Sequence, residues 1–314
     1  MRNISPEELK RILENHELWL NREGGECADL SSVDLRDHIL VYANLSYANL
    51  KGADLRYINL NDTNLRNANL IDADLRYADL EEANLKYADL RNANLGGADL
   101  KYADLKEANL KYADLRRADL SYANLKSADL RGANLKESDL SNANLAYTDL
   151  SDTNLSYASL VNANLTNADS NNAKLNHANL KHAILRGANL GGADLSDVKT
   201  NIYTIGYNLA CPEKGSFIGY KKADNCIVEL LILEDSKRSS ATSVKCRCDK
   251  AKVLHIINIE TDSYIEEVRS DYDENFVYRI GEIVSVDDYD DDRWNECSTG
   301  IHFFVSKQDA INYK

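Results

Sequence analysis

Four side chains in the last third of the chain have the chemistry of a metal site. Cys246 and Cys248 are separated by one residue, and Cys297 and His302 follow later in the sequence. Thiolate and imidazole groups are the ligands that tetrahedral Zn²⁺ prefers. The spacing is weak evidence, because alternate residues of any strand share one face and zinc knuckles usually place two residues between paired cysteines. We favour free thiols in a protein core as the interpretation.

A run of acidic residues at 287–292 offers oxygen ligands that would suit Ca²⁺. The run lacks the glycine and the terminal glutamate of an EF-hand loop, so a solvated acidic loop is the better interpretation. The sequence contains no phosphate-binding glycine loop, no paired histidines of a zinc protease and no nucleophile elbow. We therefore expect no catalytic residue and no cofactor.

Most of the chain repeats with a period of five residues. Leucine occupies every fifth position from Leu30 to Leu195 except at Ser170, and a small residue, mostly alanine, stands two positions before it. An α-helix would spread these leucines around its circumference, and a straight strand would send successive leucines to opposite faces. The pattern instead predicts a coil. Ala-x-Leu forms each short extended side with both apolar side chains inward, and the next two residues turn a corner.

Residues 28–199 resemble the pentapeptide-repeat family, whose repeat is this Ala-Asp/Asn-Leu-x-x unit. The resemblance implies a mainly β fold, a right-handed quadrilateral β-helix with four pentapeptides per coil. Residues twenty positions apart would then stack on one face, and such a solenoid needs protected ends. We divide the chain into an N-terminal capping helix and linker (1–27), the β-helix (28–199) and a C-terminal α+β domain of unknown function (200–314).

The N-terminal segment has the sequence of a short helix. Ser5 and Pro6 are typical of a helix N-terminus, an apolar face continues to Leu20, and Gly24 and Gly25 follow. We expect a helix over about residues 6–20 that covers the first leucine layer. A helix that binds a partner is the alternative.

The C-terminal segment changes in composition after Val198. Aliphatic and aromatic runs there predict strands, and a short helix is expected from about Ser306. The segment resembles uncharacterised domains that follow pentapeptide repeats in bacterial and phage proteins, most clearly at residues 296–304. That resemblance implies no known activity.

An enzyme is an alternative for the C-terminal domain. Residues 300–313 are faintly similar to the segment of ADP-ribosyltransferases that helps to form the nicotinamide pocket. Those enzymes commonly need a later glutamate to orient the ribose, and this sequence does not supply one. A deep pocket that contains His302 and Tyr278 would favour this alternative.

Charge restricts the partners that the coil could bind. The formal net charge of −14 argues against nucleic acid as a ligand. Some pentapeptide-repeat proteins, however, resemble duplex DNA in size and charge and bind type II topoisomerases such as DNA gyrase. In this chain the position after leucine forms basic columns, which we interpret as a salt-bridged surface. The acidic face, our candidate interaction face, consists of Asp62, Asp79, Glu81, Glu82, Asp99, Asp119 and Asp139.

Tyrosine is frequent at the second corner position of the repeat. Pairs such as Tyr57 with Tyr77 and Tyr102 with Tyr122 are one coil apart, so we expect their rings to stack. A protein-binding patch is the alternative, because tyrosine is favoured at interfaces.

The corner residues also lead to an expectation about backbone conformation. A type II turn needs a positive φ at its third residue. We do not expect it at tyrosine corners such as Tyr77 and Tyr112. The residues that we expect to adopt it are Gly52, Gly97, Gly132 and Gly187.

The sequence predicts a non-catalytic protein-protein interaction scaffold. No stretch is apolar enough to span a membrane, residues 1–20 do not resemble a signal peptide, and the six cysteines are too sparse for a disulfide scaffold. We therefore expect a cytoplasmic protein with a protein partner of unknown identity and with no direct nucleic-acid or membrane partner. The alternatives are a DNA-mimicking binder of DNA gyrase and a C-terminal domain with ADP-ribosyltransferase-like activity.

Overall fold

The computed structural model describes residues 1–201, 203–206, 211–212, 214–240, 244–273, 275–292 and 298–313. The chain forms two compact units. The first, here called the β-helix unit, comprises Met1–Ala188 and Ala193–Ile205. The second, called the C-terminal unit, comprises Asn189–Gly192 and Gly206–Lys314. Neither helix of the described residues is long and apolar enough to cross a membrane.

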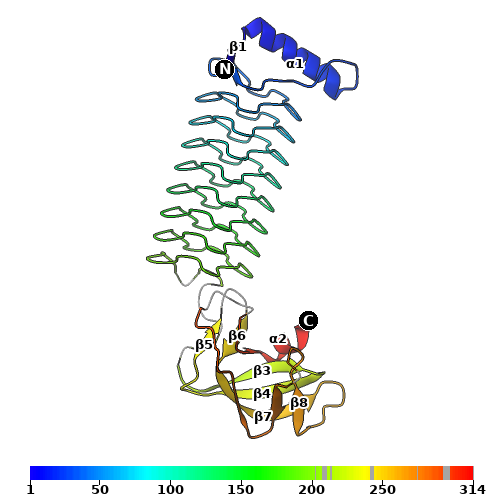
Figure 1. Cartoon of the computed structure of the whole chain (residues 1–314), viewed down its shortest axis with the longest axis vertical. Coiled ribbons are helices and arrows are strands. Elements are labelled where there is room, and N and C mark those ends of the chain that lie inside the picture. The colour runs from blue at the N-terminus through cyan, green and yellow to red at the C-terminus, as the bar shows by residue number, and fades with distance from the viewer. Residues whose placement is uncertain are drawn as a thin grey trace. The chain divides into compact units, whose positions relative to one another are not determined.

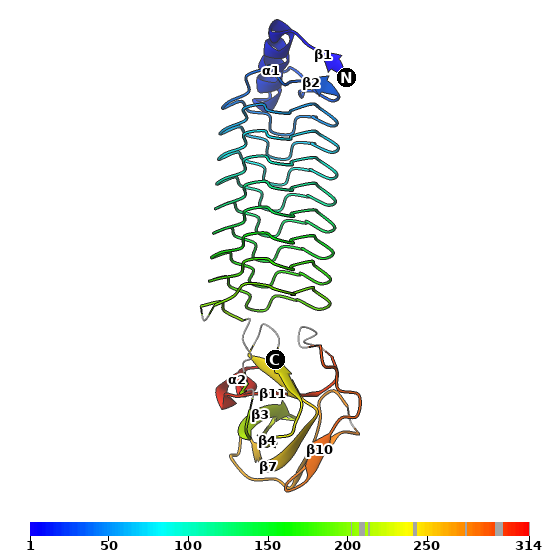
Figure 2. The same cartoon turned by 90° about the vertical axis from the view of Figure 1, so that its left-hand side faces the viewer.

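The β-helix unit is a stack of coils with one pentapeptide on each side (Figures 1 and 2). In most pentapeptides the residue before the leucine, usually Asp or Asn, forms a parallel bridge to the residue twenty positions later, as Asp79 does to Asp99. Backbone hydrogen bonds join the same coils, such as Leu80 N to Asp99 O at 2.7 Å. Twenty residues therefore make one coil. The mainly β architecture that the repeat predicted is confirmed, and the coil continues past residue 199 to a bridge between Ile184 and Ile205.

Leucine fills the interior of the coil. Leu110 and the equivalent leucines from Leu30 to Leu190 have essentially no exposed surface, and most of the alanines two positions earlier are buried beside them. Where threonine replaces alanine, its hydroxyl donates to a backbone carbonyl, as Thr63 Oγ1 does to Leu40 O at 2.9 Å. A buried hydroxyl needs such a partner. Ser170 departs from both rules. It stands where a leucine is expected, and its buried hydroxyl has no acceptor among the described residues.

Almost every described corner is a tight turn in which the residue after the corner bonds back to the leucine, as Ala48 N does to Leu45 O at 3.0 Å. From Ser32 to Asp197 the second corner residue has a positive φ, whether or not it is glycine, except at Asp37. Tyr77 has a φ of 59° and Tyr112 a φ of 60°, close to the 69° of Gly97. Our expectation that tyrosine corners avoid this conformation was wrong.

Closure of the coil explains why tyrosine accepts this strained turn. A left-handed conformation costs an L-residue roughly 1–2 kcal/mol. The turn, however, aims the corner N–H at the next coil, where Tyr112 N donates to Arg131 O at 3.0 Å. At two corners glycine is required for steric reasons. A Cβ on Gly97 or Gly132 would lie 2.6 Å from the ring of the tyrosine one coil earlier, so these glycines leave room for that ring.

The first coil is covered by helix α1 (Pro6–Leu20). Ser5 is the N-cap, and its Oγ accepts from Glu8 N at 3.1 Å. The helix buries Leu9 and His16, and His16 Nδ1 accepts a hydrogen bond from Ala28 N at 3.1 Å, which ties the helix to the start of the coil. Ahead of it, strand β1 (Arg2–Asn3) pairs in parallel with β2 (Val33–Asp34).

The C-terminal unit is built on a seven-stranded sheet with the order β10-β7-β4-β3-β11-β6-β5. A second, two-stranded sheet joins β8 (Glu267–Arg269) to β9 (Val277–Arg279), and the short helix α2 (Lys307–Asn312) follows β11. The strands of the main sheet are β3 (Phe217–Ala223), β4 (Cys226–Ile232), β5 (Arg238–Ser240), β6 (Lys245–Cys248), β7 (Lys250–Asn258), β10 (Ile283–Ser285) and β11 (Ile301–Phe304).

The core of this unit lies on the face of the sheet that carries Val228, Leu230 and Phe303. Phe303 of β11 packs close to the backbone of β3, because a Cβ on Gly219 would lie 2.6 Å from its ring. This close approach brings β3 and β11, far apart in the sequence, side by side in the sheet.

Candidate functional site

The basic columns of the β-helix unit are held by ion pairs. Where aspartate stands two positions before a corner arginine, the arginine turns back to it: the distance from Arg56 Nη2 to Asp54 Oδ2 is 2.6 Å, and the equivalent distance from Arg76 to Asp74 is also 2.6 Å. Arg56 Nε also lies 3.6 Å from the carboxylate of Asp74 in the next coil. The salt-bridged surface that we predicted is confirmed for most of these columns, whereas Arg66 and Lys126 lie over the rings of Tyr87 and Tyr147.

Acid should weaken this network. Hydrogen bonding from the Arg36 side chain lowers the pKa of Asp34 from 3.8 to about 2, and bonding from Arg56 lowers the pKa of Asp54. A carboxylate whose pKa is lowered by folding stabilises the protein above its unfolded pKa, and this contribution is lost as the pH falls through the folded pKa. We therefore expect the urea midpoint of the full chain to fall between about pH 5 and pH 2.

The control for this prediction is the double variant Asp34→Asn, Asp54→Asn. It keeps the side-chain oxygens that accept from the backbone amides of Arg36 and Arg56 but has no carboxylate to protonate at those two positions. Its urea midpoint should change less over the same pH range. An equal change in the variant and in the native chain would contradict the assignment.

The acidic face lies along one side of the coil. Asp79, Asp99, Asp119 and Asp139 are successive bridge partners. The middle of the face is partly neutralised, because Lys101 Nζ lies 3.2 Å from the carboxylates of both Asp99 and Asp119. Five acidic side chains of this face have no ion-pair partner among the described residues: Asp62, Asp79, Glu81, Glu82 and Asp139.

One corner column of this face changes from acidic to aromatic. Asp62 and Glu82 are followed at the same spacing by Tyr102 and Tyr122, whose rings stack with centroids 5.0 Å apart. Each of these tyrosines still exposes 52% of its surface. The predicted stacking is confirmed, and the exposed half of each residue can still contact a partner.

The three candidate zinc ligands that the structure describes, Cys246, Cys248 and His302, do not share one face of the sheet. On β6, Cys246 and Cys248 pair with Phe303 and Ile301 of β11, and the pleat places these four side chains on one face. His302 pairs with the intervening Arg247 and therefore belongs to the other face. Cys297 lies outside the described residues, and the described part of the chain contains no group of three potential ligands.

Cys246 and Cys248 are instead free thiols in the core of the C-terminal unit. Burial raises the pKa of the Cys248 thiol, which opposes the thiolate form that zinc needs. Two basic side chains of the same unit, those of Arg247 and Lys237, bind the acidic run at 287–292. The Arg247 guanidinium donates to the backbone carbonyls of Asp290 and Asp292, and Lys237 Nζ lies 3.2 Å from Asp291.

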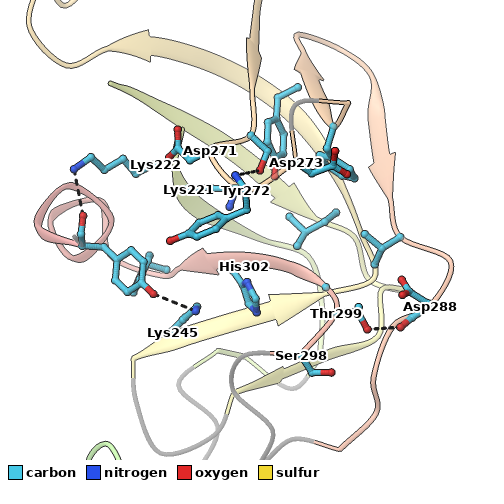
Figure 3. Close-up of a pocket in the computed structure, with 18 residues that line it drawn as sticks. Lys221, Lys222, Lys245, Asp271, Tyr272, Asp273, Asp288, Ser298, Thr299 and His302 are labelled. Atoms are coloured by element: carbon cyan, nitrogen blue, oxygen red, sulfur yellow. Dashed lines mark hydrogen bonds between the residues drawn. The ribbon is translucent and has the colours of Figure 1, made fainter. Parts of the chain in front are cut away.

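A pocket of about 750 Å³ opens on the C-terminal unit (Figure 3). Both His302 and Tyr278 line it. A pocket that contains these two residues is the feature that would favour the ADP-ribosyltransferase-like alternative. Apolar side chains form one wall, and Ser270, Ser298 and Thr299 add hydroxyl groups. His302 projects from β11 near the middle of the pocket in Figure 3.

Three lysines line the pocket, and they differ in their surroundings. Lys222 Nζ donates to Tyr313 O and Lys245 Nζ donates to Tyr313 Oη, each at 3.2 Å. Lys221 is only 8% exposed. Its Nζ lies 5.9 Å from the ring centroid of Tyr272 and 6.0 Å from that of Tyr278. Burial lowers the pKa of Lys221.

Sequence reasoning missed Lys221, although its strand contains a signal. In Phe217–Ala223 the alternation places Gly219, Lys221 and Ala223 on the buried face. A lysine at an inward position of a strand is unusual, because a buried ammonium loses its hydration. This signal could have marked the residue.

Comparison with known proteins identifies both parts of the chain. The family model for pentapeptide repeats matches residues 28–67, 63–101, 98–136, 133–169 and 171–199. Residues 207–310 match a family of unknown function (DUF5758). No curated protein matches the chain.

Several solved structures are similar to the repeat region. HetL, a pentapeptide repeat protein involved in heterocyst differentiation regulation in the cyanobacterium Nostoc sp. strain PCC 7120, is 35% identical over 63% of this chain and 95% of its own, with a TM-score of 0.38. A pentapeptide repeat protein of the cyanobacterium Cyanothece 51142 is 34% identical over 35% of this chain and 88% of its own, with a TM-score of 0.34. A trypsin-treated variant of QnrB1, a plasmid-mediated fluoroquinolone resistance protein, is 19% identical over 56% of this chain and 91% of its own, with a TM-score of 0.51, a likeness of fold alone.

Proposed function

Because this chain belongs to the pentapeptide-repeat proteins, we propose that it is a non-catalytic scaffold that binds another protein through the acidic face of a right-handed β-helix. The observation that carries the proposal is the corner column of Asp62, Glu82, Tyr102 and Tyr122. It places two carboxylates, for which the described residues provide no ion pair, in line with two stacked tyrosines that are half exposed.

The column fits the chemistry of a protein interface. Tyrosine is enriched at interfaces because its ring provides a large contact area and its hydroxyl a hydrogen bond. Carboxylates at the edge of such a contact select a basic partner surface and speed its association. We infer that the partner presents lysines or arginines beside an apolar contact.

The acidic face supports a one-sided contact better than mimicry of DNA. Lys101 interrupts the carboxylate column by pairing with Asp99 and Asp119, and the other sides of the coil carry arginine columns such as Arg56 and Arg76. A protein that clasps DNA offers a positively charged channel, and these ion-paired columns do not present the continuous negative charge that such a channel binds. The proposed partner therefore approaches the acidic face alone.

Affinity capture with matched variants tests the proposal. The full chain is immobilised and exposed to an extract of its source cells, beside a variant with Asp79→Lys, Glu81→Lys and Glu82→Lys. A control variant carries Asp152→Lys, a corner substitution outside the acidic face. We expect a specific partner to be retained by the native chain and by the control, and to be lost from the triple variant.

Two outcomes of the capture experiment would contradict the proposal. Retention of the same proteins by all three chains would show that the acidic face is not the binding surface. DNA gyrase as the protein lost from the triple variant would support the DNA-mimicking alternative instead. Comparison of the far-ultraviolet circular dichroism of the three chains ensures that the β-helix is intact in each.

A further inference from the structure

A buried lysine, Lys221, lines the pocket of the C-terminal unit. Lys221 is 8% exposed, and no ion pair joins its ammonium to any of the described residues; Asp271 is the acidic residue that acts on it from a distance. A buried charge without a close counter-charge is costly. Two tyrosine rings, those of Tyr272 and Tyr278, offset part of this cost through cation–π contact.

The remaining walls define the shape and polarity of a ligand. Phe276, Val286, Ile301 and Phe304 provide an apolar surface, and two exposed tyrosines, Tyr272 and Tyr313, also line the pocket. A volume of about 750 Å³ lies within the range of small-molecule sites and is larger than a single inorganic ion requires.

The acidic residues that line the pocket limit the ligand further. Asp271, Asp273 and Asp288 line the pocket and are exposed. They oppose a ligand that carries several negative charges, because the outer charges would lie among these carboxylates. A cationic ligand is also disfavoured, since the faces of Tyr272 and Tyr278 already hold the ammonium of Lys221.

We propose that this pocket binds a small aromatic monoanion, with its acidic group paired with Lys221 and its ring against the apolar wall. The anion supplies the counter-charge that Lys221 otherwise lacks among the described residues, and the ring fills the apolar part of the cavity. The site is independent of the protein contact that we propose for the β-helix, and the loss of either activity leaves the other measurable.

Two fluorescent probes that differ by one charged group test this proposal on the full chain. The probe 8-anilinonaphthalene-1-sulfonate is an aromatic monoanion, and N-phenyl-1-naphthylamine is its counterpart without the sulfonate. Lys221→Met removes the charge but keeps a long apolar side chain. We expect this change to weaken binding of the sulfonate probe by at least about tenfold and to change binding of the uncharged probe by less than about twofold.

Lys252→Met is the matched control, because Lys252 lies on β7 and does not line the pocket. It should leave the affinity for both probes unchanged. Equal weakening of both probes by Lys221→Met would assign Lys221 a structural role, and unchanged affinity for the sulfonate probe would remove it from the site. Either result would overturn the proposal.

Displacement experiments on the native chain remain informative if Lys221→Met fails to fold. Benzoate should displace the sulfonate probe, whereas benzylamine and inorganic phosphate at the same concentration should not. Displacement by phosphate as effective as that by benzoate would show that the site selects charge without the ring. Failure of benzoate to displace the probe would contradict the proposed ligand class.

Discussion

Replacement of Leu110 by alanine is expected to lower the free energy of unfolding by about 2 to 5 kcal/mol. Leu110 has no exposed surface, and its column continues through Leu90 and Leu130 in the neighbouring coils. The truncation therefore leaves a cavity bordered from both sides. The coils are also joined by the backbone bonds that flank it, such as Leu110 N to Asp129 O at 2.7 Å, so the structure has little freedom to collapse into the space.

The neighbouring residue provides the control. Lys111 Nζ lies 3.1 Å from Asp129 Oδ2 at the surface of the coil, and exposed ion pairs are worth at most about 1 kcal/mol. Lys111→Ala should therefore reduce stability by far less than Leu110→Ala. The measurement is the urea midpoint for loss of the far-ultraviolet circular dichroism signal. Equal shifts in the two variants would contradict the inward position of the leucine.

The coil could be predicted from the sequence because its constraint is periodic. A leucine at every fifth position requires a coil that turns all of them inward, and the resemblance to the pentapeptide-repeat family implied the four sides per coil from which the spacing of twenty residues follows. The corner conformation could not be predicted from residue preference. The turn at Tyr77 is fixed by closure of the coil and by bonds to the next coil, and these outweigh the preference of tyrosine for a negative φ.

The surface of the coil could be predicted in outline only. The spacing placed Asp79, Asp99 and Asp119 on one face, as the structure shows. It did not reveal that Lys101 reaches both Asp99 and Asp119. That contact depends on the rotamer of a long side chain, which a positional pattern does not specify.

The C-terminal unit shows where sequence reasoning fails for non-local pairing. The zinc hypothesis needed His302 on the same face as Cys246, and the register of β11 against β6 places it on the opposite face. The pocket depends on β3, β11 and the segment around Tyr272, which are distant in the sequence. No periodic pattern links these segments, so the sequence alone predicted neither the cavity nor the role of Lys221.

Replacement of Gly25 by alanine is expected to detach helix α1 from the first coil. Gly25 has a φ of 73°, and a Cβ on it would lie 2.2 Å from Asn15 O and 3.0 Å from Trp19 N, both backbone atoms of the helix. Backbone cannot move aside as a flexible side chain can. The change should therefore cost the strain of a left-handed alanine and, in addition, the contacts of Leu9 and His16 under the helix.

Gly24→Ala separates these two effects. Gly24 also has a positive φ, 100°, but a Cβ there would meet no atom within 4 Å, so this variant carries only the backbone strain, about 1–3 kcal/mol. We expect Gly25→Ala to be less stable than Gly24→Ala by at least about 2 kcal/mol. In a Trp294→Phe background, emission from Trp19 should shift to the red in Gly25→Ala alone, because the contact of its ring with Tyr47 of the coil, at a centroid distance of 6.2 Å, is lost. Equal stability and equal emission in the two variants would show that α1 does not depend on this close approach.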